Sequence, residues 1–237
     1  MEPSATTEQA AKQNGKAEAA EATPDAGPVK PRLAAMRTLA KTDAAAAQSE
    51  TWDWFQEAGK RISSDREAAI AELETLFGAG TPSEGIDGQT EGILVGFTTK
   101  PIPDRILAAI TGAWMPWAGK RFDSAAGKGD NLLAKSAKWP AKLLWPFYGA
   151  KDAGERLVAF DFTTRVEEGA VDPGHDVLVI DYAPVDDNPR VIIKSIRDEL
   201  VEVVPGTHLG KMLWRTGPYE DAKYHLLAFF ALKTPVG

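Results

Sequence analysis

The sequence predicts a mainly β protein, in which antiparallel strands curl into a small barrel behind one or two short helices and a disordered N-terminal tail. Three observations support this prediction. Short apolar runs recur over residues 155–237, and turn residues such as Pro205-Gly206 separate them. Within several runs apolar and polar residues alternate, as in a strand with one buried face. The first 48 residues, in contrast, are rich in alanine and contain no aromatic residue.

The composition favours a soluble, cytoplasmic protein with a single folded domain. Residues 1–48 bury too little apolar surface to offset the entropy of ordering them, so we expect a disordered tail and a barrel domain at 49–237. The formal charge of −7 disfavours nucleic acid or anionic membranes as partners. Since the chain has no cysteine, disulfides and thiolate catalysis are excluded. The sequence shows no transmembrane segment and no signal peptide.

Two helices are expected at the start of the folded part. Ser64-Asp-Arg-Glu67 has the capping-box pattern, and Gly78 is a natural helix end. Between them, apolar residues share one helical face: Ile70, Leu73, Leu76 and Phe77. We expect this helix to plug or cover one end of the sheet. The apolar spacing over residues 101–111 predicts the second helix.

The remaining segments fit strands and the turns between them. Residues 139–147 are aromatic and interrupted by proline, which indicates a packed loop or an edge element. In residues 155–166 the even positions from Val158 to Val166 are expected on one face of a half-buried strand, and Asp161 and Arg165 on the other. The predicted strands cover residues 91–98, 155–166, 176–182, 190–204, 207–215 and 224–232.

A tryptophan motif carries a family resemblance. Trp117-Ala-Gly-Lys-Arg-Phe122 resembles the Trp-x-Gly-Lys-x-Phe core of bacterial GXWXG-type domains, which are small β-rich domains of unknown role. The chain departs from that pattern at Pro116, where glycine is usual. The general layout is also similar to that of the lipocalins, which are up-and-down barrels. This resemblance implies a calycin-like barrel whose interior binds lipids, pigments, fatty acids or haem.

The tryptophan motif and its surroundings supply the first ligand-binding candidates. Trp114 and Trp117 can form walls of an apolar pocket, because indole offers a large apolar face and one donor. Alternatively, they seal the barrel. Lys120 and Arg121 are neighbours, so one of them points inward if this segment is a strand. That cation can pair with a ligand carboxylate or with an internal acid such as Asp198.

Three consecutive charges interrupt an otherwise apolar predicted strand at Arg197, Asp198 and Glu199. At least one of them faces the sheet interior, and a buried charge needs a partner. Arg197 or Asp198 can anchor a polar head group, or can form an internal ion pair with Lys120, Lys211 or Arg215. On the predicted strands we also place three further residues among the ligand-binding candidates: Tyr182, Lys211 and Trp214.

Neither the histidines nor any catalytic motif in the sequence gives much support for metal binding or catalysis. His208 and His225 lie on the last two predicted strands and can approach each other. However, the sequence has no His-Glu-x-x-His or His-x-His pattern, so no metal is predicted. In nitrobindin-like barrels a histidine on the last strand ligates haem, which leaves a haem-binding barrel as an alternative. No Gly-x-Ser-x-Gly elbow is present, and no cofactor is predicted.

The sequence therefore favours non-enzymatic binding of an apolar or amphipathic small molecule, such as a fatty acid, an isoprenoid or an aromatic metabolite, in a barrel cavity. Two further alternatives stay open. A small isomerase or hydrolase can use Asp198 and His208 in the same cavity, provided that both face the interior. An adaptor protein with a solid barrel needs no cavity at all.

Overall fold

A computed structural model describes residues 28–98, 117–137, 148–190, 192–218 and 221–236. The helix expected at 101–111, the loop at 139–147 and Trp114 lie outside these residues. The structure has three helices and an antiparallel sheet. The helices are α1 (Val29–Leu39), α2 (Ala44–Arg61) and α3 (Arg66–Gly78); the strands are β1 (Thr81–Pro82), β2 (Gly88–Gln89), β3 (Glu91–Phe97), β4 (Trp117–Asp123), β5 (Lys128–Ala134), β6 (Lys151–Ala153), β7 (Arg156–Glu168), β8 (Asp176–Asp181), β9 (Ile196–Val204), β10 (Thr207–Thr216) and β11 (Lys223–Lys233).

The strands form a nearly closed antiparallel barrel, as the sequence predicted. Their hydrogen-bonded order is β2-β4-β5-β7-β8-β9-β10-β11-β3, with β1 on β9 and β6 on β7. Residues 88–97 close the ring, because β2 pairs with β4 while β3, which follows directly, pairs with β11. Most connections are short hairpins; for example, Gly206 turns the chain between β9 and β10 with a φ of 71°. Short antiparallel connections of this kind give an up-and-down order.

Glycines allow the two ends of the sheet to approach at the seam between β3 and β4. The Thr90 amide donates to the Lys120 carbonyl at 2.9 Å, and the Thr90 hydroxyl donates to the same oxygen at 2.8 Å. A Cβ atom on Gly119 would lie 2.2 Å from the Thr90 carbonyl oxygen, and one on Gly92 would lie 2.6 Å from the Trp117 ring. Trp117 therefore helps to seal the barrel, which is the structural alternative that the sequence left open.

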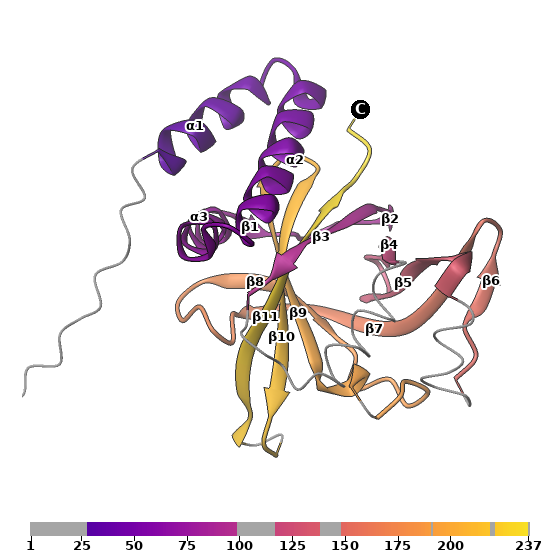
Figure 1. The fold of residues 1–237 in the computed structure, drawn as a ribbon. Helices are drawn as coiled ribbons and strands as arrows, with labels where there is room; N and C mark the ends of the chain where they lie inside the picture. Colours follow the sequence, from indigo (N-terminus) through magenta and orange to yellow (C-terminus); the bar gives the residue numbers. More distant parts are fainter. Residues whose placement is uncertain (1–27, 99–116, 138–147, 191, 219–220, 237) are drawn as a thin grey trace, which may run out of the picture.

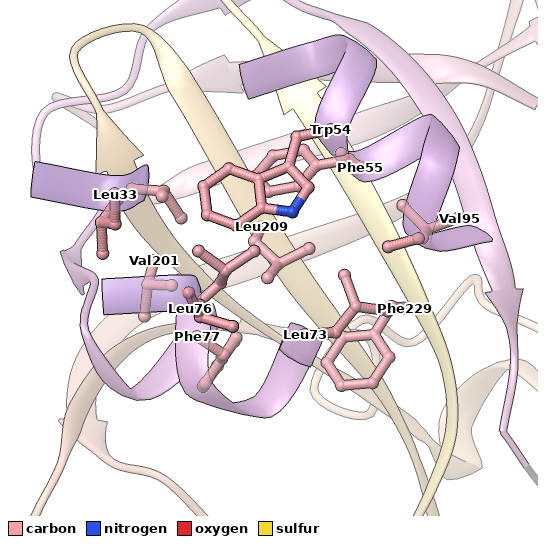
Figure 2. Close-up of a cluster of buried hydrophobic side chains, with 14 of the residues drawn as sticks. Leu33, Trp54, Phe55, Leu73, Leu76, Phe77, Val95, Val201, Leu209 and Phe229 are labelled. Atoms are coloured by element: carbon pink, nitrogen blue, oxygen red, sulfur yellow. The ribbon is translucent and has the colours of Figure 1, made fainter. Parts of the chain in front are cut away.

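The three helices pack on the outer face of the sheet (Figure 1). Figure 2 shows Trp54 and Phe55 of α2 and Leu73, Leu76 and Phe77 of α3 against strand residues. The apolar face predicted for α3 is thus the buried one. Its place differs from the expected one: α3 covers the outer face of β9 and β10, whereas it was expected to plug or cover one end of the sheet. No described helix has the length and hydropathy needed to cross a bilayer.

The start of the folded part also differs from the prediction. Residues 29–39, which lie within the segment expected to be a disordered tail, form α1, in which Val29 and Leu33 are buried. Arg37 fixes this helix by donating through Nε to the Val203 carbonyl at 3.1 Å and through Nη2 to the Ala79 carbonyl at 2.5 Å. The few apolar residues of this alanine-rich segment gain their partners from α2, α3 and the outer core of the sheet, which explains why local composition did not reveal the helix.

Beneath the helices, the inner face of the sheet encloses a second core. It contains aromatic and aliphatic side chains from both halves of the barrel, among them Phe162 of β7 and Phe230 of β11. The alternation predicted for β7 fails at residues 157–160, all of which are buried. Phe160 has a φ of 55°, and the register with β5 shifts nearby. Such a bulge turns consecutive side chains away from solvent.

Candidate functional site

The inner core contains a buried polar cluster around Lys120, whose side chain is 0% exposed. Its ammonium Nζ donates to Asn131 Oδ1 at 2.9 Å, to Asp198 Oδ2 at 2.9 Å and to the Tyr182 hydroxyl oxygen at 2.5 Å. The Tyr182 hydroxyl in turn donates to Asp198 Oδ2 at 2.8 Å. The internal ion pair between Lys120 and Asp198, one of the two pairings that the sequence offered for this cation, is present.

Strand register brings these four residues together from distant parts of the chain. Lys120 on β4 lies opposite Asn131 on β5, and Asp198 on β9 lies opposite Ile180 on β8. Tyr182 follows Ile180 by two residues, so it points to the same side of the sheet. By the same alternation Arg121 points outward, where its Nη2 donates to Asp130 Oδ2 at 2.5 Å.

Aromatic rings surround the ammonium group. Lys120 Nζ lies between 5.3 and 5.7 Å from the ring centroids of Trp117, Phe162, Tyr182 and Phe230. The Trp117 ring meets Phe230 edge-on, and its Nε1 donates to Asn131 Oδ1 at 3.1 Å. A cation at such distances is attracted to the ring faces, and the rings exclude water from it.

Burial dominates the electrostatics of the cluster. It lowers the pKa of Lys120 below its ordinary value, while the charge and hydrogen bond of Asp198 act in the opposite direction. Burial, together with the negative charge of Asp198, raises the pKa of Tyr182 well above its ordinary value. Tyr182 therefore remains a neutral hydroxyl, able to donate and to accept.

One atom of the cluster is left unsatisfied. Asp198 Oδ1 is buried and has no hydrogen-bond partner among the described residues. A buried polar atom without a partner costs about 1–3 kcal/mol, and more when it carries charge. The cluster thus has a free acceptor inside the barrel, next to a saturated ion pair.

A second buried polar pair lies at another level of the inner face. His208 on β10 is 3% exposed, and its Nδ1 is hydrogen-bonded with the Ser83 hydroxyl at 2.8 Å. His208 Nε2 has no partner among the described residues. A cavity of about 310 Å³ adjoins this pair and is also lined by Glu84, Glu202 and Thr234. Burial alone lowers the pKa of His208 to about 4.

His208 is therefore expected to make the protein less stable in mild acid. Below pH 6.5 the unfolded chain takes up a proton that the folded chain accepts only near pH 4, so stability falls as the pH drops through this window. Between pH 7 and pH 4.5 the loss amounts to about 2–3 kcal/mol. Urea unfolding at both pH values, for wild type and His208→Gln, measures it.

The buried carboxyls of Asp130 and Glu199, whose pKa values are raised by burial, act in the opposite direction but are common to both proteins. The difference between the two proteins therefore isolates the histidine. An equal loss of stability on acidification in both would contradict a neutral, buried His208.

Three predicted ligand-binding residues have side chains that face away from the barrel interior. Arg121 faces outward. Arg197 lies on the outer face, where Nε donates to Glu199 Oε1 at 2.7 Å. Lys211 is also on that face, held by Asp172 Oδ1 at 2.7 Å and Glu74 Oε2 at 2.5 Å. The reason is strand alternation: neighbours of inward residues point outward. Trp214 is half-buried and packs against the inner core.

The two histidines of the last strands do not meet. His208 lies opposite Leu232, whereas His225 lies opposite Trp214, near the other end of the same pair of strands. His225 is exposed, and its Nε2 is hydrogen-bonded with the Thr216 hydroxyl at 3.1 Å. An exposed histidine of this kind does not fit a buried haem pocket. Among the described residues, no three His, Asp or Glu side chains gather as metal ligands.

Asp198 and His208 both face the barrel interior, which the enzymatic alternative required. They nevertheless lie four residues apart along the paired strands, because Asp198 is opposite Met212 and His208 is opposite Glu202. This spacing corresponds to about 13 Å. Proton transfer directly between the two side chains is excluded at that separation.

The sequence did not predict several residues of the Lys120 cluster, nor the partner of His208. Asn131 sits in a short run with Leu132 and Leu133, and its inward direction depends on a register shift opposite Trp117. The sequence context of Phe162 and Phe230 does not distinguish them from other apolar core residues. Ser83 lies in a segment that reads as a loop, and nothing local relates it to His208.

Comparisons with known proteins add one structural likeness. No family model matches the chain, and no curated protein matches it. A solved structure, described as a protein from Thermomonospora curvata, aligns with a TM-score of 0.41 and 17% sequence identity. The alignment covers 78% of this chain and 99% of that one.

Proposed function

We propose that the protein binds an amphipathic small molecule inside the barrel without catalysing a reaction, and that the polar group of this ligand meets the Lys120–Asp198 cluster. The observation that carries the proposal is the unpartnered Asp198 Oδ1 within a fully buried ion pair. The similarity of the general layout to that of the lipocalins agrees with a binding role.

A purely structural role explains this arrangement less well. Removing two charges from water costs several kcal/mol each, and their attraction offsets this only when the remaining hydrogen-bonding groups are satisfied. Here one carboxylate oxygen is unsatisfied. Replacement of such a pair by apolar side chains is often neutral or stabilising. A bound group that donates to Asp198 Oδ1 would recover the missing hydrogen bond.

The cluster favours a neutral head group that donates a hydrogen bond. Lys120 already donates to three acceptors, and Asp198 neutralises its charge. A ligand carboxylate would have to displace one of these acceptors and would face Asp198 at close range. A hydroxyl or an N–H group meets Asp198 Oδ1 without either cost, which favours an alcohol over a fatty acid.

One cavity borders the aromatic wall of the cluster. Its volume is about 600 Å³, it reaches Phe122 and Phe162, and its other lining residues are mainly polar or charged, among them Arg121, Asp130 and Asp161. Phe162 also belongs to the aromatic wall around Lys120. A volume above about 300 Å³ is sufficient for a small ligand. Each buried methylene of an aliphatic chain contributes about 0.8 kcal/mol, so an aliphatic alcohol that buries about ten methylenes can bind with micromolar affinity.

Native mass spectrometry of the untagged protein tests this proposal. We expect dodecanol to bind at least tenfold more tightly than dodecanoate to the wild-type protein. Asp198→Asn should weaken dodecanol binding at least tenfold, whereas Glu91→Gln, which alters an exposed carboxylate paired with Lys233, should leave it unchanged. Circular dichroism confirms that each variant is folded.

Two results would contradict the proposal in different ways. Tighter binding of dodecanoate would overturn the assignment of a neutral head group. A protein that carries no ligand on purification and binds neither compound would indicate a solid barrel and a structural role for the cluster.

A further inference from the structure

We propose that Lys120 captures carbonyl compounds: its amine condenses with the aldehyde of an amphipathic ligand to form a Schiff base, with Asp198 as counter-ion and Tyr182 as proton carrier. This inference rests on the proposed binding function and narrows its ligand class. Amine, hydroxyl and carboxylate meet at one point of the barrel, with distances of 2.5, 2.8 and 2.9 Å between them.

The step is balanced without any further reactant. Lys120 first gives one proton to Asp198 Oδ2. The neutral amine then attacks the carbonyl carbon, and Tyr182 donates a proton to the carbonyl oxygen and takes one from nitrogen, which gives a neutral carbinolamine. Tyr182 next protonates the carbinolamine hydroxyl, which leaves as water while the carbon–nitrogen double bond forms as an iminium ion. Asp198 returns its proton to Tyr182, and its carboxylate balances the iminium charge.

The surroundings of Lys120 favour both the amine and its product. Burial lowers the pKa of Lys120, and a desolvated lysine in an apolar pocket is the usual form of a nucleophilic amine. The four rings around Nζ exclude the water that would hydrolyse the imine. Their faces also stabilise an iminium cation as they do an ammonium ion.

A second buried lysine shows what this arrangement adds. Lys211 is 1% exposed, like Lys120, but two carboxylates hold it, from Asp172 and Glu74. Two negative charges stabilise the ammonium form, and no hydroxyl group donates or accepts a hydrogen bond at Lys211 Nζ among the described residues. Lys211 is therefore a matched control: a buried, ion-paired lysine without the proton carrier.

The experiment uses one equivalent of dodecanal and sodium cyanoborohydride with the full-length protein. Intact mass and peptide mapping locate the reduced adduct. We expect Lys120 to be modified at least tenfold faster than any other lysine, in wild type and in Lys211→Arg. Lys120→Arg, which keeps the charge, should lose this rapid adduct. Tyr182→Phe should slow its formation at least tenfold, whereas Lys211→Arg should leave its rate unchanged.

The outcomes separate this inference from the proposed function. Binding of dodecanol without preferred modification of Lys120 by dodecanal would overturn the Schiff base and leave the binding function intact. Failure of both would overturn both. If Lys120→Arg does not fold, peptide mapping of the wild type decides, since uniform labelling of the exposed lysines excludes a special reactivity of Lys120.

Discussion

Replacing Asp198 by leucine is expected to destabilise the protein by about 3–5 kcal/mol, as measured by urea unfolding at pH 7. The substitution keeps a similar volume but leaves Lys120 fully buried without its carboxylate. Breaking a buried ion pair by removing one partner has a cost of this size, because an uncompensated charge remains in a medium of low dielectric constant. The Tyr182 and Asn131 oxygens offset only part of it.

The double variant Lys120→Met/Asp198→Leu provides the control. It removes both charges, and we expect it to recover most of the lost stability, since well-packed apolar residues often replace a buried ion pair without loss. An exposed pair gives the comparison: Glu91→Gln removes the partner of Lys233 at the surface and should cost less than about 1 kcal/mol. A loss below 1 kcal/mol in Asp198→Leu would mean that Lys120 is uncharged in the folded protein.

Gly119→Ala is expected to destabilise the barrel by about 3 kcal/mol or more. The residue has a φ of 139°, which an L-amino acid with a side chain rarely adopts, and the added Cβ would lie 2.2 Å from the Thr90 carbonyl oxygen. Backbone strain and overpacking each cost about 1–3 kcal/mol. Both act here at once, and the crowding atom is main chain, which cannot move aside without opening the seam. Urea unfolding measures the loss.

Gly85→Ala separates the two contributions. Gly85 has a φ of 76°, but no atom lies within 4 Å of the position of its Cβ. Gly85→Ala therefore introduces backbone strain without crowding. Its free energy of unfolding should fall by only about 1–2 kcal/mol. Equal losses at Gly85 and Gly119 would show that β3 and β4 are not in close contact at the seam.

The strands and the inward lysine could be predicted because their signals are local. Alternation located the strands from β7 to β11, and it required one of Lys120 and Arg121 to face inward once their segment forms β4. The interruption of β9 by charges indicated a buried partner for Asp198. Both inferences follow from the two-residue period of a strand.

The partners in the cluster could not be predicted, because they depend on register between strands far apart in the sequence. Asn131 and Tyr182 reach Lys120 only once β4, β5, β8 and β9 are paired. The outward direction of Arg197 and Lys211 follows from the same register. Similarly, α1 is stabilised by contacts of Val29, Leu33 and Arg37 with distant residues, which a composition average cannot detect.

The unequal layering of the barrel gives its two halves different rigidity. The outer core beneath the helices draws on β3 and on β8 to β11, and includes no residue of β4, β5 or β7. Amide hydrogens of β9 and β10 should thus exchange most slowly, and those of β4 and β5 faster. Lys120 and Asn131 lie on β4 and β5, in the part of the barrel that the outer core does not cover and that we call the thinner wall. Asp198 lies on β9, which the outer core covers. Local opening of the thinner wall would part the ion pair and admit a guest molecule while the rest of the fold stays intact.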